Sequence, residues 1–446
     1  MRAVHAGSLA LLLALPLAGC TGDSSPEKTT VRFERAAAPQ VALATGQGLS
    51  APVTIGVVVS GTSPRGEGQE DLPLAAGARV AAYRLNLGAD ATRVTLAVVD
   101  DRGTAAGSLA AVASLREQGV AGIVYASQGL HIAGGLAAAA QADVPVLLPY
   151  ETRPLPAAAT TSFRTGPTGA QVTDRLASFL ADRGLDAPFV LSGEGVAPEL
   201  QGLGAASRRG RLFAGPSLLS EAERAATSLG SGAADAVVLS ASAASQAEAV
   251  AALQEYDAGA TVLLAPTALS PLFATRLAGL GRQGAATTAG QYFTAGTAVT
   301  DSSTVPAVAG FLSAVRLAAE EETTQSLLGS RPFRAVGAST ADGRSHDAVV
   351  ALVRAAVAAS SAAPEDVLGA LRVLSVGAVD GLVGPALDFR AEEVVSDSDV
   401  VVLQASRRDL SPRAELPGAP ALQWFAVDPV TAQPAPPSIV PTPAAS

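Results

Sequence analysis

The sequence predicts an α/β protein whose body folds into two doubly wound parallel-sheet lobes. Short runs of residues with high strand propensity alternate with Ala-rich helical stretches, and this alternation occurs in two successive series. Strands that alternate with helices pair in parallel and are covered on both faces, so each series predicts one sheet. The chain has 446 residues, which is long enough for two units. Only 4% are aromatic, so Ala, Val and Leu must form the core.

The expected elements follow one another in a regular order. In the first series we expect strands at 53–60, 94–99, 120–125 and 144–148, and helices at 74–87, 105–118 and 130–142. In the second series we expect a helix at 170–183, strands at 188–192 and 236–240, a helix at 245–258 and a strand at 261–265. The carboxyl ends of parallel strands meet at one sheet edge, so a ligand is expected in the cleft between the two units.

The N-terminus is predicted to be a lipoprotein signal peptide, residues 1–19. A basic start at Arg2 precedes an apolar run over residues 9–17, which is shorter than the ~20 residues that a membrane-spanning helix needs. The run ends in Leu-Ala-Gly-Cys, which resembles the bacterial lipobox, whose cysteine thiol (here Cys20) receives a diacylglycerol. The alternative is an ordinary secretory signal followed by a chance cysteine. Cys20 is the only cysteine, so the body has no intramolecular disulfide.

Two further segments are expected to lie outside the folded body. Residues 20–51 are poor in large apolar side chains and are predicted to form a flexible tether, and the Pro- and Ala-rich residues 428–446 are predicted to be disordered. The net charge is −10 and Lys28 is the only lysine. Phosphate binding needs clustered basic side chains, so no nucleic-acid partner is expected.

A series of short motifs resembles one known family in order and spacing. The segments are 55–59, 98–101, 115–120, 123–129 and 144–149, followed by Phe163-Arg164-Thr165, residues 234–239, Ser345-His346-Asp347-Ala348 and a Gly-x-x-Gly-x-x-x-Phe pattern at 381–389. Together they resemble the leucine/isoleucine/valine-binding family of solute-binding proteins, which have the type I periplasmic-binding-protein fold. The resemblance covers residues 55–154 most closely.

The resemblance implies two lobes joined by a three-segment hinge. Lobe one is then expected to hold 52–168 and 290–385, and lobe two 169–289 and 386–427, with crossings near Thr165, Ala289 and Gly384. It further implies a protein without a cofactor, lipid-anchored on the extracytoplasmic face of the cell membrane, that captures a small polar, amino-acid-like solute and passes it to an ABC permease. A second interpretation is a sensor or envelope interaction lipoprotein of the same fold that no longer serves transport.

The resemblance also implies ligand-binding residues on lobe one. Ser127 matches the hydroxyl donor to the solute's carboxylate, in a loop with Gln128 and Gly129; its alternative is a helix N-cap. Thr152 matches the second anchor, and its alternative is an exposed loop threonine. Tyr150 is expected to cover the solute or to support its loop.

The loops of lobe two depart from the family's pattern. Pro266-Thr267 stands where amino-acid binders usually carry an acidic residue. Glu194, in a neighbouring loop, is therefore the candidate partner for a solute ammonium, with a solvent-facing turn residue as its alternative. Glu151 is expected to be a solvated loop carboxylate, with an ion pair to a solute ammonium as its alternative.

No enzyme is predicted. The three histidines are His5 in the signal peptide, His131 and His346, which leaves no His-rich metal site and little material for a Ser-His-Asp triad. A nucleophile elbow and a Walker loop are absent from the sequence. His131 is expected to have a structural or rim role. Asp100 and Asp101 are interpreted as a strand-to-helix turn with an N-cap carboxylate, and not as a metal pair.

Overall fold

The structure is a computed structural model that describes most of the body. The described residues are 40–44, 52–63, 68–88, 93–193, 198–205, 208–211, 216–256, 259–297, 306–329, 331–391, 393–407, 413, 416–417 and 419–427. They all belong to one compact unit, Pro39–Ser446. The predicted signal peptide with Cys20, most of the predicted tether, Glu194 and the tail 428–446 lie outside the described residues.

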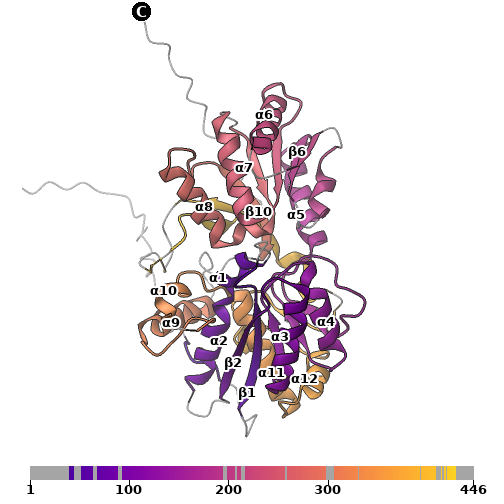
Figure 1. The fold of residues 1–446 in the computed structure, drawn as a ribbon, viewed down its shortest axis with the longest axis vertical. Helices are drawn as coiled ribbons and strands as arrows, with labels where there is room; N and C mark the ends of the chain where they lie inside the picture. The colour runs from indigo at the N-terminus through magenta and orange to yellow at the C-terminus, as the bar shows by residue number, and fades with distance from the viewer. Residues whose placement is uncertain are drawn as a thin grey trace, which may run out of the picture. The chain divides into compact units, whose positions relative to one another are not determined.

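The first sheet has five parallel strands in the order β2-β1-β3-β4-β5. Their bounds are Val53–Val59 for β1, Val94–Asp100 for β2, Gly122–Tyr125 for β3, Val146–Leu148 for β4 and Ser162–Arg164 for β5. The helices around this sheet are α2 (Gly77–Asn86), α3 (Ala105–Glu117), α4 (Ala133–Ala140), α11 (Gly343–Ala359) and α12 (Pro364–Leu371) (Figure 1). Because helices cover both faces, the inner strand β1 is almost entirely buried and apolar.

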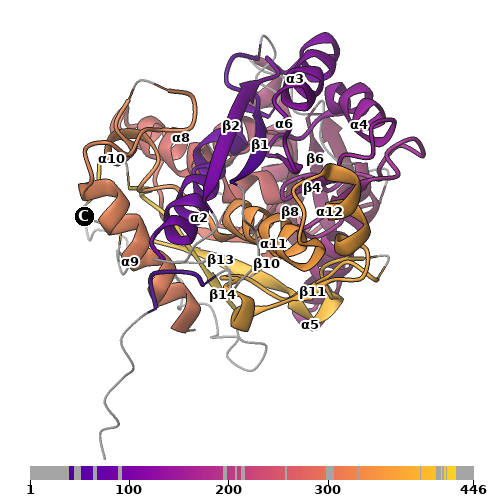
Figure 2. The same cartoon turned by 90° about the horizontal axis from the view of Figure 1, so that it is seen from below.

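The second sheet has seven strands in the order β14-β13-β10-β9-β8-β6-β7. Their bounds are Pro188–Ser192 for β6, Arg209–Arg211 for β7, Ala236–Ser240 for β8, Thr261–Leu264 for β9, Gln291–Thr297 for β10, Val400–Ser406 for β13 and Gln423–Ala426 for β14. Strands β6 to β10 pair in parallel, and β13 and β14 extend the sheet antiparallel (Figure 2). The covering helices are α5 (Gly169–Asp182), α6 (Pro216–Gly230), α7 (Ala243–Glu255) and α8 (Pro271–Arg282).

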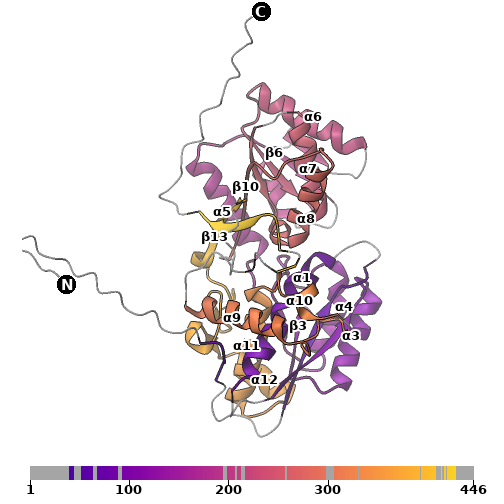
Figure 3. The same cartoon turned by 90° about the vertical axis from the view of Figure 1, so that its left-hand side faces the viewer.

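The expected lobe boundary near residue 290 is wrong. Strand β10 hydrogen-bonds with β9 and β13, so it belongs to the second sheet. The chain returns to the first sheet later, with α9 (Pro306–Glu320), which packs against α2. Figure 3 shows α9 beside α11, and Phe311 of α9 contacts His346 of α11. The last crossing also lies beyond the expected Gly384. The amide of Gly384 donates to Asp347 of α11, and β12 (Leu387–Asp388) still pairs with β11 (Ser375–Val376), before β13 joins the second sheet.

The remaining expected strands and helices of both series are confirmed within a few residues, with one informative difference. The helix expected at 74–87 is divided into α1 (Leu72–Ala75) and α2, with Ala76 between them. A Cβ atom on Gly77 would lie 1.9 Å from the carbonyl oxygen of Asp342. The break therefore occurs where the chain before α11 packs directly onto the backbone of α2, which only glycine permits.

No single helix within the described ranges is long and apolar enough to cross a membrane, although α11 and α12 together, bent by 101°, have the length and composition to do so.

Candidate functional site

The candidate site lies where the loops after β3 and β4 meet. These strands are parallel neighbours, so their carboxyl ends share one edge of the first sheet. The backbone N–H of Gly129, after β3, donates to Glu151 Oε2, after β4, over 3.2 Å. The two predicted binding loops are therefore in direct contact.

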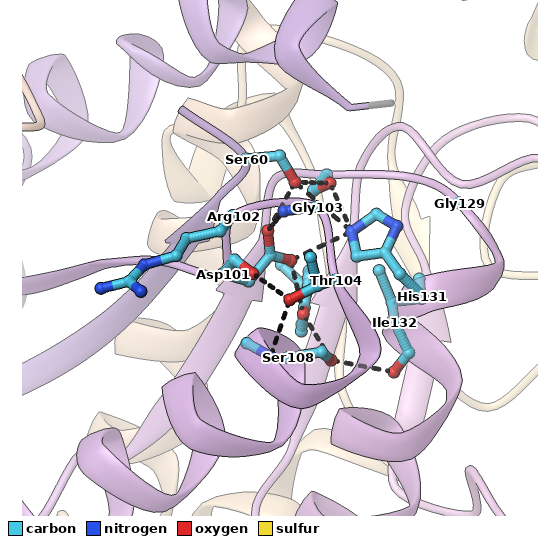
Figure 4. A network of polar contacts seen from close by, with 12 residues as sticks. Ser60, Asp101, Arg102, Gly103, Thr104, Ser108, Gly129, His131 and Ile132 are labelled. Atoms are coloured by element: carbon cyan, nitrogen blue, oxygen red, sulfur yellow. Dashed lines mark hydrogen bonds and ion pairs between the residues drawn. The ribbon is translucent and has the colours of Figure 1, made fainter. Parts of the chain in front are cut away.

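Ser127 belongs to a buried polar network. Its Oγ is 2.6 Å from Ser60 Oγ, and Ser60 donates to Asp101 Oδ1 over 2.6 Å. Asp101 Oδ2 also accepts from the Tyr125 hydroxyl, at 2.8 Å, and lies 3.1 Å from His131 Nε2 (Figure 4). Ser127 is fully buried, and the helical turns after it have no side-chain cap, so the N-cap alternative is wrong. The network instead joins the loops after β1, β2 and β3.

Asp101 is the centre of this network. Burial by itself raises the pKa of its carboxyl, but hydrogen bonds from His131, Ser60, the Gly103 backbone and Tyr125 outweigh burial and lower the pKa below its usual value. Asp101 is not the N-cap of α3, as the sequence had suggested. Thr104 caps that helix, because its side chain accepts from the Gly107 N–H.

The network does not have the geometry of a catalytic triad. In a triad the histidine meets the carboxylate with one ring nitrogen and the serine with the other. In this network Nε2 of His131 faces Asp101, and it is the same nitrogen that lies 3.4 Å from both Ser60 and Ser127. A carboxylate only accepts, so Nε2 carries the proton and cannot take one from either serine.

His346, the other histidine of the described body, is also structural. Its Nε2 lies 3.0 Å from Nη1 of buried Arg84, and its Nδ1 lies 2.8 Å from Asp347 Oδ1. Arginine only donates, so Nε2 accepts and Nδ1–H donates to Asp347. Burial lowers the pKa of His346. Among the described residues, no group of three or more His, Cys, Asp or Glu is placed to hold a metal ion.

Tyr150 supports its loop. Its buried hydroxyl donates to Asp342 Oδ1 over 2.7 Å, and Asp342 caps α11 by accepting from the Ser345 N–H. The guanidinium of Arg344 lies over the ring, 4.6 Å from its centre. Burial and the nearby Asp342 carboxylate raise the pKa of Tyr150 well above its usual value. These contacts correspond to the supporting alternative; covering a solute stays a prediction.

Glu151 is not the solvated carboxylate that we expected. It is only 3% exposed and forms a two-pronged ion pair with Arg153, with nitrogen–oxygen distances of 2.9 and 2.8 Å. Thr152 is partly buried, and its carbonyl oxygen accepts from the Gly169 N–H at the start of α5. Its main chain therefore joins the loop to the second series, while a role for its hydroxyl in binding remains a prediction.

Two acidic residues at this site were missed by the sequence analysis. Glu70 and Asp71 lie in the 3-10 turn Gln69–Asp71 and are 9% and 3% exposed. Asp71 accepts from Gln128 Nε2 at 3.2 and 3.0 Å. Burial raises the pKa of Glu70 to about 7. Burial, and then the charge of Glu70, raise the pKa of Asp71 as well. The only sequence signal is a pair of adjacent acids before Leu72-Pro73, which is typical of a solvated turn.

The loops of the second sheet are held together by Gln246 and Thr267. Gln246 Oε1 accepts from the Ala265 N–H over 2.8 Å, and its Nε2 lies 2.7 Å from Thr267 Oγ1. The Thr267 hydroxyl donates to the carbonyl of Ala241. Thr267 thus fixes the loop after β9 to the loop after β8.

The fold is that of the type I periplasmic binding proteins, as the resemblance implied. It is similar to an extracellular ligand-binding receptor from Rhodopseudomonas palustris HaA2, with a TM-score of 0.60 and 12% identity over 81% of this chain and 99% of that one. The branched-chain amino acid substrate-binding protein LivJ from Streptococcus pneumoniae, in complex with isoleucine, gives a TM-score of 0.59 and 14% identity over 84% and 99% of the two chains.

A third similar structure is a fatty acid ABC transporter substrate-binding protein from Thermomonospora curvata. Its TM-score is 0.57, and its identity is 16% over 88% of this chain and 97% of that one. No protein-family model and no curated protein matches the sequence.

Proposed function

We propose that this chain is a non-catalytic, extracytoplasmic solute-binding protein of an ABC importer. The observation that carries the proposal is the arrangement of loops around Glu70 and Asp71. Asp71 accepts from Gln128 in the loop after β3, and Glu70 accepts from the N–H of Ala243, the first residue of α7, which follows β8. The carboxyl edges of both sheets thus contribute to one place, which is where open α/β sheets bind ligands. Solved structures of the same fold are described as substrate-binding proteins of ABC transporters.

The proposed ligand is a small polar, amino-acid-like solute. Its contacts would come from the loop Ser127-Gln128-Gly129, from Tyr150 and from Thr152, with Glu194 as the acidic partner for an ammonium group. Ser127 can reach a solute only if Gly68 moves, because a Cβ atom on Gly68 would lie 2.2 Å from Ser127 Oγ. The proposed anchor is a lipid on Cys20, and the proposed partner is a permease in the cytoplasmic membrane.

A thermal-shift screen of the mature protein tests the proposal. Amino acids, short amides, polyols and small peptides would each be added at high concentration. A ligand present at 100 times its Kd stabilises the folded state by about 2.7 kcal/mol, which is a readily measured shift. One class of solute should raise the melting temperature in a saturable way. If no solute does so in a protein with normal circular dichroism, solute capture is the wrong function.

The second candidate is a sensor or envelope interaction lipoprotein that has lost transport. Thr267, at the position where amino-acid binders usually have an acid, favours it, because its hydroxyl is already engaged with Ala241 and Gln246. Uptake measurements separate the two functions. Deleting the gene should abolish uptake of the identified solute if the chain serves an importer, and should leave uptake unchanged if it serves as a sensor.

A further inference from the structure

Residues 68–75 are attached firmly to the first sheet's side of the site. The carbonyl oxygen of Leu74 accepts from the Asp342 N–H at 3.2 Å and from Ser345 Oγ at 3.0 Å. The carbonyl of Pro73 accepts from Thr340 Oγ1 at 2.9 Å. Asp71 adds its contact with Gln128. This segment therefore moves with α11 and with the loop after β3.

Glu70 extends from this segment to the second sheet. Its Oε2 accepts from the backbone N–H of Ala243, the first residue of α7, over 3.1 Å. Its carbonyl oxygen accepts from the hydroxyl of Ser270, the N-cap of α8, over 2.7 Å. Ala243 follows β8 and Ser270 follows β9, so both donors lie at the carboxyl edge of the second sheet.

The same segment covers the predicted ligand donor. Gly68 adopts a positive φ of 75° and packs so closely that a Cβ atom would lie 2.2 Å from Ser127 Oγ and 2.9 Å from Ser60 Oγ. Ser127 is fully buried as a result. One short segment thus bridges the two sheets and closes access to the loop after β3.

We propose that residues 68–71 form an autoinhibitory strap, latched by Glu70, that holds the carboxyl edges of the two sheets together and covers Ser127. The inference rests on the proposed function, because it concerns access to the same site. Release of Glu70 from Ala243 and Ser270 frees the second sheet to move away from the first.

Burial of Glu70 makes this latch sensitive to pH, and the hydrogen bond from Ala243 acts in the opposite direction. Asp71 follows on the same turn; burial and the charges of Glu70 and Glu151 raise its pKa, while Arg344 and the hydrogen bond from Gln128 lower it. Burial raises the pKa of Glu70 to about 7 from 4.5, and that of Asp71 is raised as well. An acid whose pKa is raised in the closed state stabilises that state fully at pH values below its unperturbed pKa. This contribution is lost as the pH rises through the raised pKa. The latch therefore weakens as pH rises through about 7.

Distance measurements between two spin labels test the strap without any ligand. The labels replace exposed Arg116 on α3 and exposed Glu223 on α6, as cysteines in a Cys20→Ala background. In the wild-type background the longer distance should be a minor population at about pH 5 and grow as pH rises to about 7, the interval between the two pKa values of Glu70. Glu70→Ala removes the acceptor for Ala243, and the ratio of long to short distances should rise about fivefold at pH 6, where Glu70 is mainly protonated and the lost hydrogen bond is a neutral one.

Two further variants complete the test. Glu70→Gln keeps an oxygen that accepts from Ala243 but cannot ionise, so it should stay mainly closed at pH values where the wild type opens, and only the pH response of Asp71 should remain. Glu365→Ala on α12, an exposed site away from the strap, should behave as wild type.

A folded Glu70→Ala protein with the wild-type distances overturns the proposal. If Glu70→Ala fails to fold, an identical pH response in wild type and Glu70→Gln overturns it instead. Because no solute is present, either result leaves the solute screen to decide the proposed function on its own.

Discussion

Replacing Asp101 by Asn tests whether the buried network positions the loops of the site. The Asp101 carboxylate accepts from four donors: Ser60 Oγ and the Gly103 N–H on Oδ1, and the Tyr125 hydroxyl and His131 Nε2 on Oδ2. An Asn side chain keeps one acceptor oxygen, so Ser60 and Gly103 retain their partner. The NH₂ group then faces the donors on the other side, and the N–H of His131 loses its acceptor.

The expected cost follows from these contacts. Hydrogen bonds to a charged group contribute about 1.5–3 kcal/mol, and a buried donor left without its acceptor costs about 1–3 kcal/mol. We expect Asp101→Asn to lower the unfolding free energy by about 3 kcal/mol, measured by urea unfolding at pH 7. The matched control is Asp100→Asn. Asp100 is only partly buried and accepts from the Gly61 and Arg102 amides and the Thr62 hydroxyl, so its cost should be about 1 kcal/mol.

The pH dependence of the unfolding free energy provides a second test of this prediction. Because the pKa of Asp101 is lowered from 3.8, its contribution is complete above pH 3.8 and is lost as pH falls through the lower native value. The stability difference between wild type and Asp101→Asn should therefore shrink in strong acid. Experimental error in the unfolding free energy is on the order of 0.5 kcal/mol. If Asp101→Asn and Asp100→Asn lose the same unfolding free energy within this error at every pH, the central role of Asp101 is refuted.

Three other predictions concern the anchor, the loop after β4 and the buried histidine. Cys20→Ala should release the protein from membranes without unfolding it, and a variant that still partitions into detergent would contradict the lipid anchor. Tyr150→Phe should lower the unfolding free energy by about 1 kcal/mol through loss of the bond to Asp342, and an unchanged urea midpoint would argue against the supporting role. Burial, with a further contribution from the charge of Arg84, lowers the pKa of His346, so its contribution to stability is complete above pH 6.5 and is lost as pH falls below it. His346→Gln should reduce the fall in unfolding free energy below pH 6.5, measured by urea titrations at several pH values. An unaltered pH profile in this variant would contradict the role given to His346.

Much of the fold could be predicted because its signals are local. Strand β8 and helix α5 differ from their neighbours in residue type and in the spacing of their apolar residues. The sequence predicts both within one or two residues of their observed bounds. The sheet to which a strand belongs is not a local property. The sequence of Gln291–Thr297 would suit a strand in either sheet. Only the pairing of this strand with β9 and β13 shows that it belongs to the second sheet.

The candidate site could be predicted in outline only. The meeting of the loops after β3 and β4 follows from strand order, which the alternating pattern predicts. The environment of Glu70 does not follow from strand order, because its partners Ala243 and Ser270 lie 173 and 200 residues away in the chain. A Glu-Asp pair in a turn is usually solvated, and the sequence has no signal that the second sheet covers it. Ser127 was expected to be a ligand donor or a helix cap, yet its closest partner is Ser60, 67 residues earlier.

Titration of one solute against wild type and Ser127→Ala tests the central claim most directly. The solute would be the one that gives the largest thermal shift, measured by isothermal calorimetry. Solute capture at the loop after β3 predicts saturable binding by wild type, and a loss of about 1.5–3 kcal/mol of binding free energy in Ser127→Ala, the range for a hydrogen bond to a charged group. Folding of the variant is checked by its urea midpoint. Unchanged affinity in Ser127→Ala would contradict the claim and leave Ser127 as a structural member of the network with Ser60 and Asp101.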